Sequence, residues 1–346
     1  MEYYKRSPFL FTYWDKQNKL TIYNYNRYTK AIITRDITKI LDVLSNWKSS
    51  EEIIGKLNDI DRGNLTKVLR QLTKLSIVHK RPAASEDNNI PSETEWNPVE
   101  LAMQRQLSYP GLFPKIRNRK NPLCHMKTVR GLSSVVLPEA NLNSAQKRPL
   151  LDVLEERQTI RRYGNSFIDM DSLSHFLYKC ARIKKVLNTQ VLWGLRLTKR
   201  PYPSGGARYP LEIYPVNNKI PDIHKGIYYY NPLKHKLELI NKEETYREKL
   251  NASILRQLKP LINREPDVVF IITAVFARTM WKYKNIGLSL IMSELGCLYQ
   301  TMYLVATEMN LAPCPLGGTY EELVRDWLNL NWFEESHIGT FMLGKK

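Results

Sequence analysis

The sequence predicts an α+β protein with a small N-terminal unit and a larger C-terminal domain. Helical patterns are mixed with strand-like segments, and the strands include antiparallel hairpins. A polar, proline-containing stretch at residues 82–98 separates two regions that differ in their patterns of predicted helices and strands. The 346 residues are 43% hydrophobic, which supports a real core. We expect one domain over residues 1–82, a connector over 83–149 and a second domain over 150–346.

The first unit opens with strand patterns. Residues 9–14 and 19–25 alternate and are rich in β-forming side chains, and the "DKQN" between them is typical of a turn. Residues 31–36 are a candidate third strand. The segment "KLTIYNY", residues 19–25, is the one we expect to lie at an exposed edge, where a bound peptide adds a strand.

Three helical patterns and a strand complete this unit, which is the order of a winged helix. The first covers 36–47 with Asp36 as its cap, and the second opens with a capping box of Ser49 and Glu52. The third covers 62–75, and a short strand at 76–81 follows. The third helix carries basic residues, which in winged helices often contact DNA; they are Arg62, Lys67, Arg70 and Lys74. The alternative is a solvated face on a peptide-binding or partner-binding module, which we expect here.

The connector contains little that predicts chemistry. Residues 98–109 form a candidate short helix, and "KIRNRKNP" is a basic, solvated run. We expect the connector to wrap the main domain or to cover a site.

The second domain alternates helices and strands. The expected helices cover part of 149–164, 168–183 with Asp169 or Asp171 as its cap, 241–258, and a long apolar pattern over 285–313. One expected strand follows a Gly/Pro loop at 200–209, and two more form a hairpin around Asn231 and Pro232. Further strands are expected at 267–276 and 337–346.

Composition narrows the class of protein. The formal net charge is +18, from 52 basic and 34 acidic residues, which favours anionic partners. The four cysteines form no CxxC pair and no Cys/His cluster, so we expect no metal site and no disulfide framework. The N-terminus does not read as a signal peptide, and charged or polar residues interrupt every long apolar run. We expect a cytoplasmic protein with no membrane or nucleic-acid partner.

The first chemical motif is "RQTIR". Arg157, Thr159 and Arg161 alternate just past a helix, so an extended backbone would place them on one face. Two guanidinium groups and a hydroxyl suit a phosphate. The alternative is a charged helix end, which basic residues favour anyway.

The second motif is the loop "PSGG". Pro203 stiffens the approach, and Ser204, Gly205 and Gly206 allow the backbone to come close to a ligand. The alternative is an ordinary tight turn into a strand.

The third motif is the sequence Trp281-Lys282-Tyr283, where the strand at 267–276 gives way to the long helix. Tyrosine has a reference pKa of about 10, and a neighbouring ammonium favours its phenolate form. Lys282 and Tyr283 are therefore candidates for a proton-transfer pair, while Trp281 is expected to pack. The alternative is an aromatic anchor beside a solvated lysine. Adjacent side chains cooperate only if the backbone turns at this point.

In this order the motifs resemble the nitroreductase-like flavoprotein superfamily, and within it the SagB-type dehydrogenases. The R-x-S/T-x-R segment, the "PSGGA-x-x-P-x-E-x-Y" loop over 203–214 and the K-Y dipeptide match in sequence. A double glycine at Gly317 and Gly318 follows the long helix, and the chain closes near Gly344 and Lys345. The resemblance covers about 150–346, and the N-terminal unit is similar to that of longer members.

The resemblance implies an FMN-binding α/β sandwich that forms a homodimer with FMN at its interface. It assigns the cofactor-binding residues Arg157, Gln158, Thr159, Arg161, Pro203, Ser204, Gly205, Gly206, Gly317, Gly318 and Lys345, and the catalytic residues Lys282 and Tyr283. It implies oxidation of thiazolines or oxazolines to thiazoles or oxazoles in a ribosomally made precursor peptide, with a cyclodehydratase as partner. The alternative is an FMN reductase of dehydroamino acids or nitro compounds that uses NAD(P)H.

Two positions depart from the family pattern. Gln158 stands where a second arginine is common, which weakens one expected contact. Cys297 stands after Gly296 where the family usually has histidine, so the exact substrate is less firmly implied.

Overall fold

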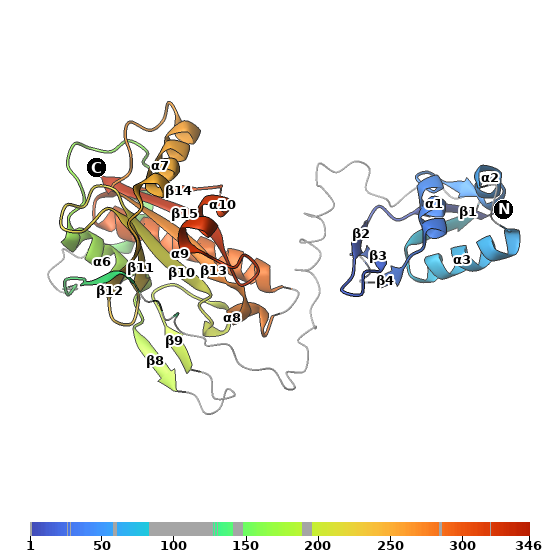
Figure 1. Ribbon diagram of the computed structural model, residues 1–346, viewed down its shortest axis with the longest axis horizontal. Helices are drawn as coiled ribbons and strands as arrows, with labels where there is room; N and C mark the ends of the chain where they lie inside the picture. The colour runs from blue at the N-terminus through green and yellow to red at the C-terminus, as the bar shows by residue number, and fades with distance from the viewer. Residues whose placement is uncertain are drawn as a thin grey trace. The chain divides into compact units, whose positions relative to one another are not determined.

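The chain forms two compact units, residues 1–111 and 112–346. The computed structural model (Figure 1) describes residues 2–25, 27, 29–57, 61–82, 127, 129, 131–140, 148–188, 196–283, 286–318 and 320–346. The predicted short helix at 98–109 and Cys124 lie outside these residues. Each unit is described by itself.

In its described residues, the N-terminal unit contains two three-stranded antiparallel sheets and three helices. One sheet has the order β5-β1-β6, with β1 at Glu2–Arg6, β5 at Lys48–Ser49 and β6 at Val78–Pro82. The other has the order β2-β3-β4, with strands Leu10–Trp14, Leu20–Asn24 and Thr29–Ile32. The helices are α1 (Arg35–Val43), α2 (Ser50–Lys56) and α3 (Arg62–Lys74), and they bury one apolar cluster against the sheets.

Most local predictions for this unit are confirmed, and two are wrong. Ser49 and Glu52 make both bonds of the capping box. The cap of α1 is Thr34, whose side chain accepts a hydrogen bond from the Ile37 N–H, rather than Asp36, which lies in the first turn. The strand β3 is the central strand of its sheet, so the segment 19–25 is not an edge; β2 and β4 are the edges.

The C-terminal unit is built on a seven-stranded antiparallel sheet (Figure 1). Its order is β14-β15-β13-β10-β11-β12-β7. The strands are β7 (Ser133–Val136), β10 (Leu211–Asn217), β11 (Gly226–Asn231), β12 (Lys236–Asn241), β13 (Val268–Val275), β14 (Leu311–Leu316) and β15 (Glu335–Lys345). A separate hairpin joins β8 (Lys185–Asn188) to β9 (Arg196–Lys199). The mixture of helices with an antiparallel sheet confirms the predicted α+β class.

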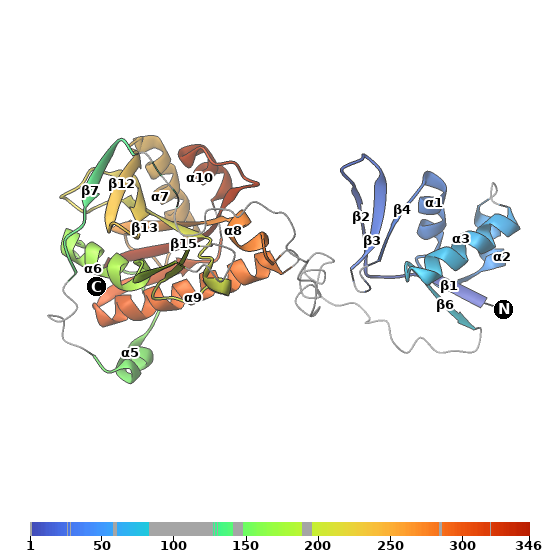
Figure 2. The ribbon, with the colours of Figure 1, turned by 90° about the horizontal axis from the view of Figure 1, so that it is seen from below.

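Helices cover both faces of this sheet. They are α5 (Leu150–Glu156), α6 (Met170–Ala181), α7 (Glu244–Leu258), α8 (Phe276–Met280), α9 (Gly287–Glu308) and α10 (Glu321–Leu328), with a short 3₁₀ turn η1 at Gly205–Ala207. Figure 2 shows α9 along one side of the sheet and α7 and α10 on the other. The α6 and α9 side shares a core with Phe270, Ile272 and Phe341, while α7 and α10 pack on the side of Val269 and Ile271. Alternate residues of β13 thus face two cores, as strand geometry requires.

The helix α9 is the central element of one layer. By length and composition it would pass as a membrane span. Its buried side chains, including Ile291, Leu298 and Met302, instead belong to the core beneath the sheet.

Several elements were not predicted. Residues 133–136, assigned to the connector, form the edge strand β7 and pair with β12. Residues 311–316, of which 311–313 were assigned to the end of the long helix, form β14 and pair with β15. Strand β1 and the short helices α8 and α10 were also missed.

Candidate functional site

The segment after α5 is extended, as the phosphate hypothesis requires. Arg157, Thr159 and Arg161 are each partly buried, whereas Gln158 and Arg162 are exposed, so the alternate residues face opposite sides. The Arg157 guanidinium lies over the Tyr303 ring of α9, 5.2 Å from its centroid. The Thr159 hydroxyl is 2.5 Å from the Tyr303 hydroxyl. Two of the three predicted side chains therefore meet at one residue of α9, and Gln158 points away from them.

Arg161 lies deeper, beside β14. Its Nε is buried and has no hydrogen-bond partner among the described residues. Burial raises the pKa of the Cys314 thiol, and the Arg161 guanidinium next to it acts in the opposite direction. The backbone around it is tied to the sheet, because the Ile160 N–H donates to the Pro313 carbonyl at 2.9 Å. The Arg161 side chain hydrogen-bonds to the Cys314 thiol, and its Nε–H is the buried donor that has no acceptor among the described residues.

The C-terminal strand ends against this same segment. The Gly164 N–H donates to the Lys345 carbonyl at 3.0 Å, and the Lys345 N–H donates to Asp267 Oδ2 at 3.0 Å. A Cβ on Gly344 would lie 2.3 Å from the Tyr163 ring, so only glycine allows this approach. The structure thus brings Lys345 close to the "RQTIR" segment, about 190 residues away in the sequence.

The loop from 203 to 209 has an unusual backbone. Gly206, Ala207 and Tyr209 have φ values of 66°, 54° and 44°. A non-glycine residue in this region costs on the order of 1–3 kcal/mol, so contacts must hold the loop in place. The Ser204 hydroxyl supplies two of them: it accepts from the Tyr209 N–H at 2.8 Å and donates to Glu294 Oε2 at 2.6 Å.

Glu294 of α9 is the buried carboxyl under this loop, and it is only 5% exposed. Burial raises its pKa to about 7, although the bond from Ser204 and the charges of Arg200 and Arg278 act to lower it. Its Oε1 is buried without a hydrogen-bond partner among the described residues. The sequence analysis missed Glu294, since a single acidic residue in an apolar helix pattern carries no distinctive spacing.

The predicted pair lies in a turn, so its two side chains come together. The N–H groups of Lys282 and Tyr283 both donate to the Thr279 carbonyl, at 3.1 and 3.0 Å. Lys282 Nζ lies 5.1 Å from the centroid of the Tyr283 ring. A Cβ on Gly206 would lie 2.9 Å from the Tyr283 hydroxyl. The pair therefore adjoins the glycine loop, and the phenol occupies the space that a side chain at position 206 would need.

Trp281 packs as expected. It is buried with Leu197, and the Arg208 guanidinium lies 5.0 Å from its ring centroid. Trp281 thus anchors the turn that presents Lys282 and Tyr283.

A buried ion pair fixes α8 under the loop. The side chains of Arg278 and Glu212 are 3% and 1% exposed, and they hydrogen-bond to each other. Arg278 also donates to the Tyr209 carbonyl at 3.0 Å, and Arg208 Nε donates to the Arg278 carbonyl at 2.7 Å. Glu212 accepts a further bond from the Tyr229 hydroxyl at 3.1 Å. The pair and these hydrogen bonds hold α8, β10 and the loop in one arrangement, although the buried Arg278 Nε has no hydrogen-bond partner among the described residues.

The site residues form two groups along α9. One contains Arg157 and Thr159, near Tyr303, and the other contains the glycine loop, near Glu294. Nine residues separate Glu294 from Tyr303, or about 14 Å of helix at 1.5 Å per residue. An elongated ligand with an anionic end suits such a spacing. Gly317 and Gly318 follow β14 and are exposed, and Gly318 lies near Gln257 of α7 rather than in either group.

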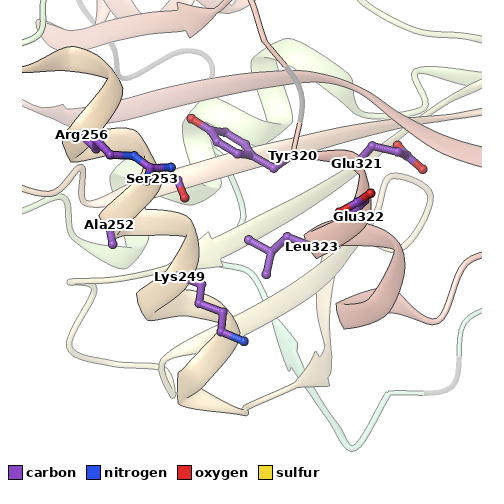
Figure 3. A pocket seen from close by; sticks show the side chains of 8 residues that line it. All are labelled: Lys249, Ala252, Ser253, Arg256, Tyr320, Glu321, Glu322 and Leu323. Atoms are coloured by element: carbon purple, nitrogen blue, oxygen red, sulfur yellow. The ribbon is translucent and has the colours of Figure 1, made fainter.

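A groove elsewhere on the unit lies apart from these groups (Figure 3). Its volume is about 670 Å³, and it runs between α7 and the start of α10. Lys249 and Arg256 line one wall, and Glu321 and Glu322 line the other. None of the predicted site residues lines it. In the described part of the chain, no cluster of three His, Cys, Asp or Glu side chains suits a metal ion.

Comparison with known proteins gives the family. The model of the nitroreductase family matches residues 154–345. A Methanocaldococcus jannaschii protein, named as a putative nitroreductase, is 29% identical over 192 residues, which are 56% of this chain and 90% of that protein.

Two further relatives are named as peptide-processing proteins. The microcin B17-processing protein McbC of Escherichia coli is 29% identical over 140 residues, 38% of this chain and 49% of that protein. The trifolitoxin-processing protein TfxB of Rhizobium leguminosarum bv. trifolii is 30% identical over 148 residues, 42% of this chain and 39% of that protein. Each match therefore spans half or less of the peptide-processing protein concerned.

The fold also matches a solved structure. The crystal structure of a putative nitroreductase from Anabaena variabilis aligns with a TM-score of 0.50 at 21% identity, over 70% of this chain and 45% of that one. This likeness concerns the fold.

The ion pair under the loop generates a stability prediction. Replacing Glu212 with Gln leaves the buried Arg278 charge uncompensated, so the free energy of unfolding should fall by about 3–5 kcal/mol. Urea denaturation followed by circular dichroism measures the change. Glu156→Gln is the matched control, because its pair with Arg148 is half exposed and should change stability by less than about 1 kcal/mol. Equal effects of the two substitutions would contradict the role given to Glu212.

Proposed function

This chain belongs to the nitroreductase family, and from that premise we propose that it is an FMN-dependent dehydrogenase acting on a ribosomally made peptide. Its reaction is the oxidation of thiazoline or oxazoline rings to thiazoles or oxazoles. The observation that carries the proposal is the Tyr283 hydroxyl, held against Gly206 with the Lys282 cation beside its ring. The similarity to two peptide-processing proteins supports a peptide substrate.

The residues present fit FMN. Arg157 and Thr159 offer a guanidinium group and a hydroxyl beside Tyr303, and Arg161 offers a second guanidinium group whose buried Nε lacks an acceptor among the described residues. A phosphate would supply that acceptor, and forked donors suit it. At the other group, Gly206 adopts a φ of 66°, and the Tyr283 phenol lies where a side chain at this position would be, so the loop and the phenol together form the proposed contact of the flavin ring. FMN, when bound, supplies the acceptor for a hydride.

The chain's own groups then handle the proton. Aromatising an azoline removes a hydride from one ring carbon and a proton from its neighbour. Tyr283 takes the proton on its phenolic oxygen in this proposal, and the Lys282 ammonium group beside its ring stabilises the phenolate. Lys282 is itself the base if it loses its proton. Trp281, the Arg278–Glu212 pair and the Thr279 carbonyl hold the turn so that this geometry persists. With FMN bound, dioxygen would be the terminal oxidant and would accept the two electrons and two protons as hydrogen peroxide.

A second candidate function is an FMN reductase of dehydroamino acids or nitro compounds fed by NAD(P)H. The observation that favours it is the match to 90% of a protein named as a putative nitroreductase. The Lys282–Tyr283 pair favours oxidation, because a reductase needs no base at this position. Turnover on a thiazoline peptide with oxygen consumption separates the two functions.

We also propose a homodimer with a shared cofactor site. The apolar side chains on the outer sides of α5 and α9 are exposed in the single chain; they include Leu150, Leu151, Leu154, Leu288 and Met292. An exposed patch of this kind marks an interface. A second copy would cover it and would bring its own loop toward the phosphate-binding group. Gln158, Gly317 and Gly318 lie outside both groups in the single chain, so they are left out of the proposed contacts to FMN.

The N-terminal unit is proposed to bind the precursor peptide or a cyclodehydratase partner. A groove of about 600 Å³ runs between β4 and α1, with Trp14, Leu20 and Ile32 on its apolar side and Arg35 and Lys39 on its basic side. Strand β4 pairs only with β3 among the described strands, so its outer edge can receive an added strand. The basic side suits an acidic peptide.

The first test concerns the cofactor. Arg157→Ala with Arg161→Ala should give folded protein with no flavin colour, because the phosphate loses both guanidinium groups. Absorbance of the purified protein and fluorescence titration with FMN measure the loss, and light scattering of the flavin-bound wild type should report two chains. Arg162→Ala, on the exposed face of the same segment, is the control that should keep its flavin. Full retention of FMN by the double variant would overturn the phosphate assignment.

The second test concerns the proton. Tyr283→Phe and Lys282→Ala should each keep FMN but slow azole formation by about 10²-fold or more, as for loss of a general base. The double variant should be little worse than the slower single variant, since the two residues act as one unit. Mass spectrometry of the peptide product follows the rate. Wild-type rates in both single variants would make the pair structural only.

The third test concerns the N-terminal unit. Ile32→Glu, at a side chain 56% exposed in the groove, should weaken binding of a labelled precursor peptide at least tenfold. Lys67→Glu with Arg70→Glu, on the exposed face of α3, should leave it unchanged. Fluorescence anisotropy measures both, with a DNA duplex as competitor. Tight, salt-sensitive duplex binding that the α3 variant loses would show a DNA-binding unit instead.

A further inference from the structure

The loop from 203 to 209 is seated on α9 through one buried carboxyl. Ser204 donates its hydroxyl hydrogen to Glu294 Oε2 at 2.6 Å, and the Tyr209 N–H occupies the hydroxyl's acceptor side. One turn earlier on α9, Leu290 contacts Gly205. Leu290 and Glu294 lie on the same face of the helix, four residues apart, and both are covered by this loop. Lifting the loop would therefore return Glu294 to water.

The charges around Glu294 do not neutralise it fully. Arg200 and Arg278 face it from the segment after β9 and from α8, and Tyr202 lies near it from the loop. Arg278 already pairs with Glu212. The second carboxyl oxygen of Glu294, Oε1, is buried with no hydrogen-bond partner in the described part of the chain. A neutral carboxyl tolerates that place, whereas an ionised one loses hydration that nothing replaces.

The sign of the resulting pH dependence follows from burial. The pKa of Glu294 in the seated loop is about 7, above the ordinary value of 4.5. Because the pKa of Glu294 is raised in the seated state, the seated loop is most stable relative to the open loop when the pH is below the ordinary glutamate pKa. It loses this stability as the pH rises through about 7. Ionisation strengthens the Ser204 hydrogen bond but leaves a buried charge without hydration, and the strained φ angles of Ala207 and Tyr209 add to the tendency of the loop to open.

We propose that Glu294 is a positioning residue whose proton keeps the Ser204–Gly206 loop seated on α9, so that loss of this proton releases the loop. Because the same loop is the proposed contact of the flavin ring, its release weakens FMN binding, a consequence that rests on the proposed function. The seated loop also keeps Gly206 against the Tyr283 hydroxyl. Binding of FMN and placement of the proton acceptor therefore share one pH-sensitive support.

Hydrogen exchange of the FMN-free protein tests the switch without the cofactor. After correction for the intrinsic exchange rate at each pH, the opening of amides 204–209 should increase about tenfold or more between pH 5.5 and 8.5. Glu294→Gln keeps the size and the acceptor for Ser204 but has no proton to lose, so its opening should not vary with pH. Glu308→Gln is the control, because Glu308 lies on the same helix in an ion pair with Lys179 and does not touch the loop. It should behave as the wild type.

The outcomes separate the switch from the proposed function. Opening of the wild-type loop that does not change with pH overturns the proposal, even if Glu294→Gln fails to fold. A pH dependence that persists in folded Glu294→Gln overturns it too. Titration with FMN at pH 6 and pH 8 should give a wild-type Kd that rises about tenfold and a Glu294→Gln Kd that stays constant. Wild type that binds no FMN at either pH overturns the proposed function, while the hydrogen-exchange result still decides the switch.

Discussion

The buried ion pair between Arg278 and Glu212 is the constraint on which the candidate site depends. It joins the short helix α8 to strand β10, and Arg278 also binds the carbonyl of Tyr209 at the end of the glycine loop. Two segments about 70 residues apart in the sequence are thereby held in one arrangement. The Tyr283 hydroxyl and Gly206 meet because this pair fixes both of their supports. Replacing both residues with apolar side chains of similar volume would stabilise the folded protein as well or better, but it would remove the hydrogen bond to the Tyr209 carbonyl.

The helix α9 connects this end of the site to the other. Its N-terminal half lies under the glycine loop through Leu290 and Glu294, and its C-terminal half presents Tyr303 to Arg157 and Thr159. The helix is packed on the sheet along its buried face, so the spacing between the two groups is rigid. A ligand with a flat ring and a remote phosphate matches a rigid spacing better than a compact ligand does. Site and core are therefore built from the same element.

Much of this could be predicted from local patterns, and the rest depends on tertiary contacts. The alternation of Arg157, Thr159 and Arg161 predicted an extended segment in which Arg157 and Thr159 meet at Tyr303, while Arg161 lies beside Cys314. The dipeptide Lys282-Tyr283 was informative because both residue types carry titratable groups. Glu294 could not be found, because its role comes from burial beneath a loop that is distant in sequence. The start of strand β14 was predicted to be helical because "LAPCPL" continues the apolar pattern of the preceding helix. Its pairing with β15, which the sequence does not reveal, makes it a strand. The edge assignment of 19–25 failed because strand order is set by partners, not by the strand's own residues.

One measurement tests the central claim, that Tyr283 and Lys282 take a proton while FMN takes a hydride from an azoline ring. The flavin-bound protein is mixed without oxygen with a thiazoline-containing peptide, and the flavin absorbance is followed in time. The account predicts that the oxidised flavin band disappears and that the peptide loses the mass of one hydride and one proton per ring. A flavin band that persists with the peptide, but disappears when NAD(P)H is added, would contradict the account and identify a reductase.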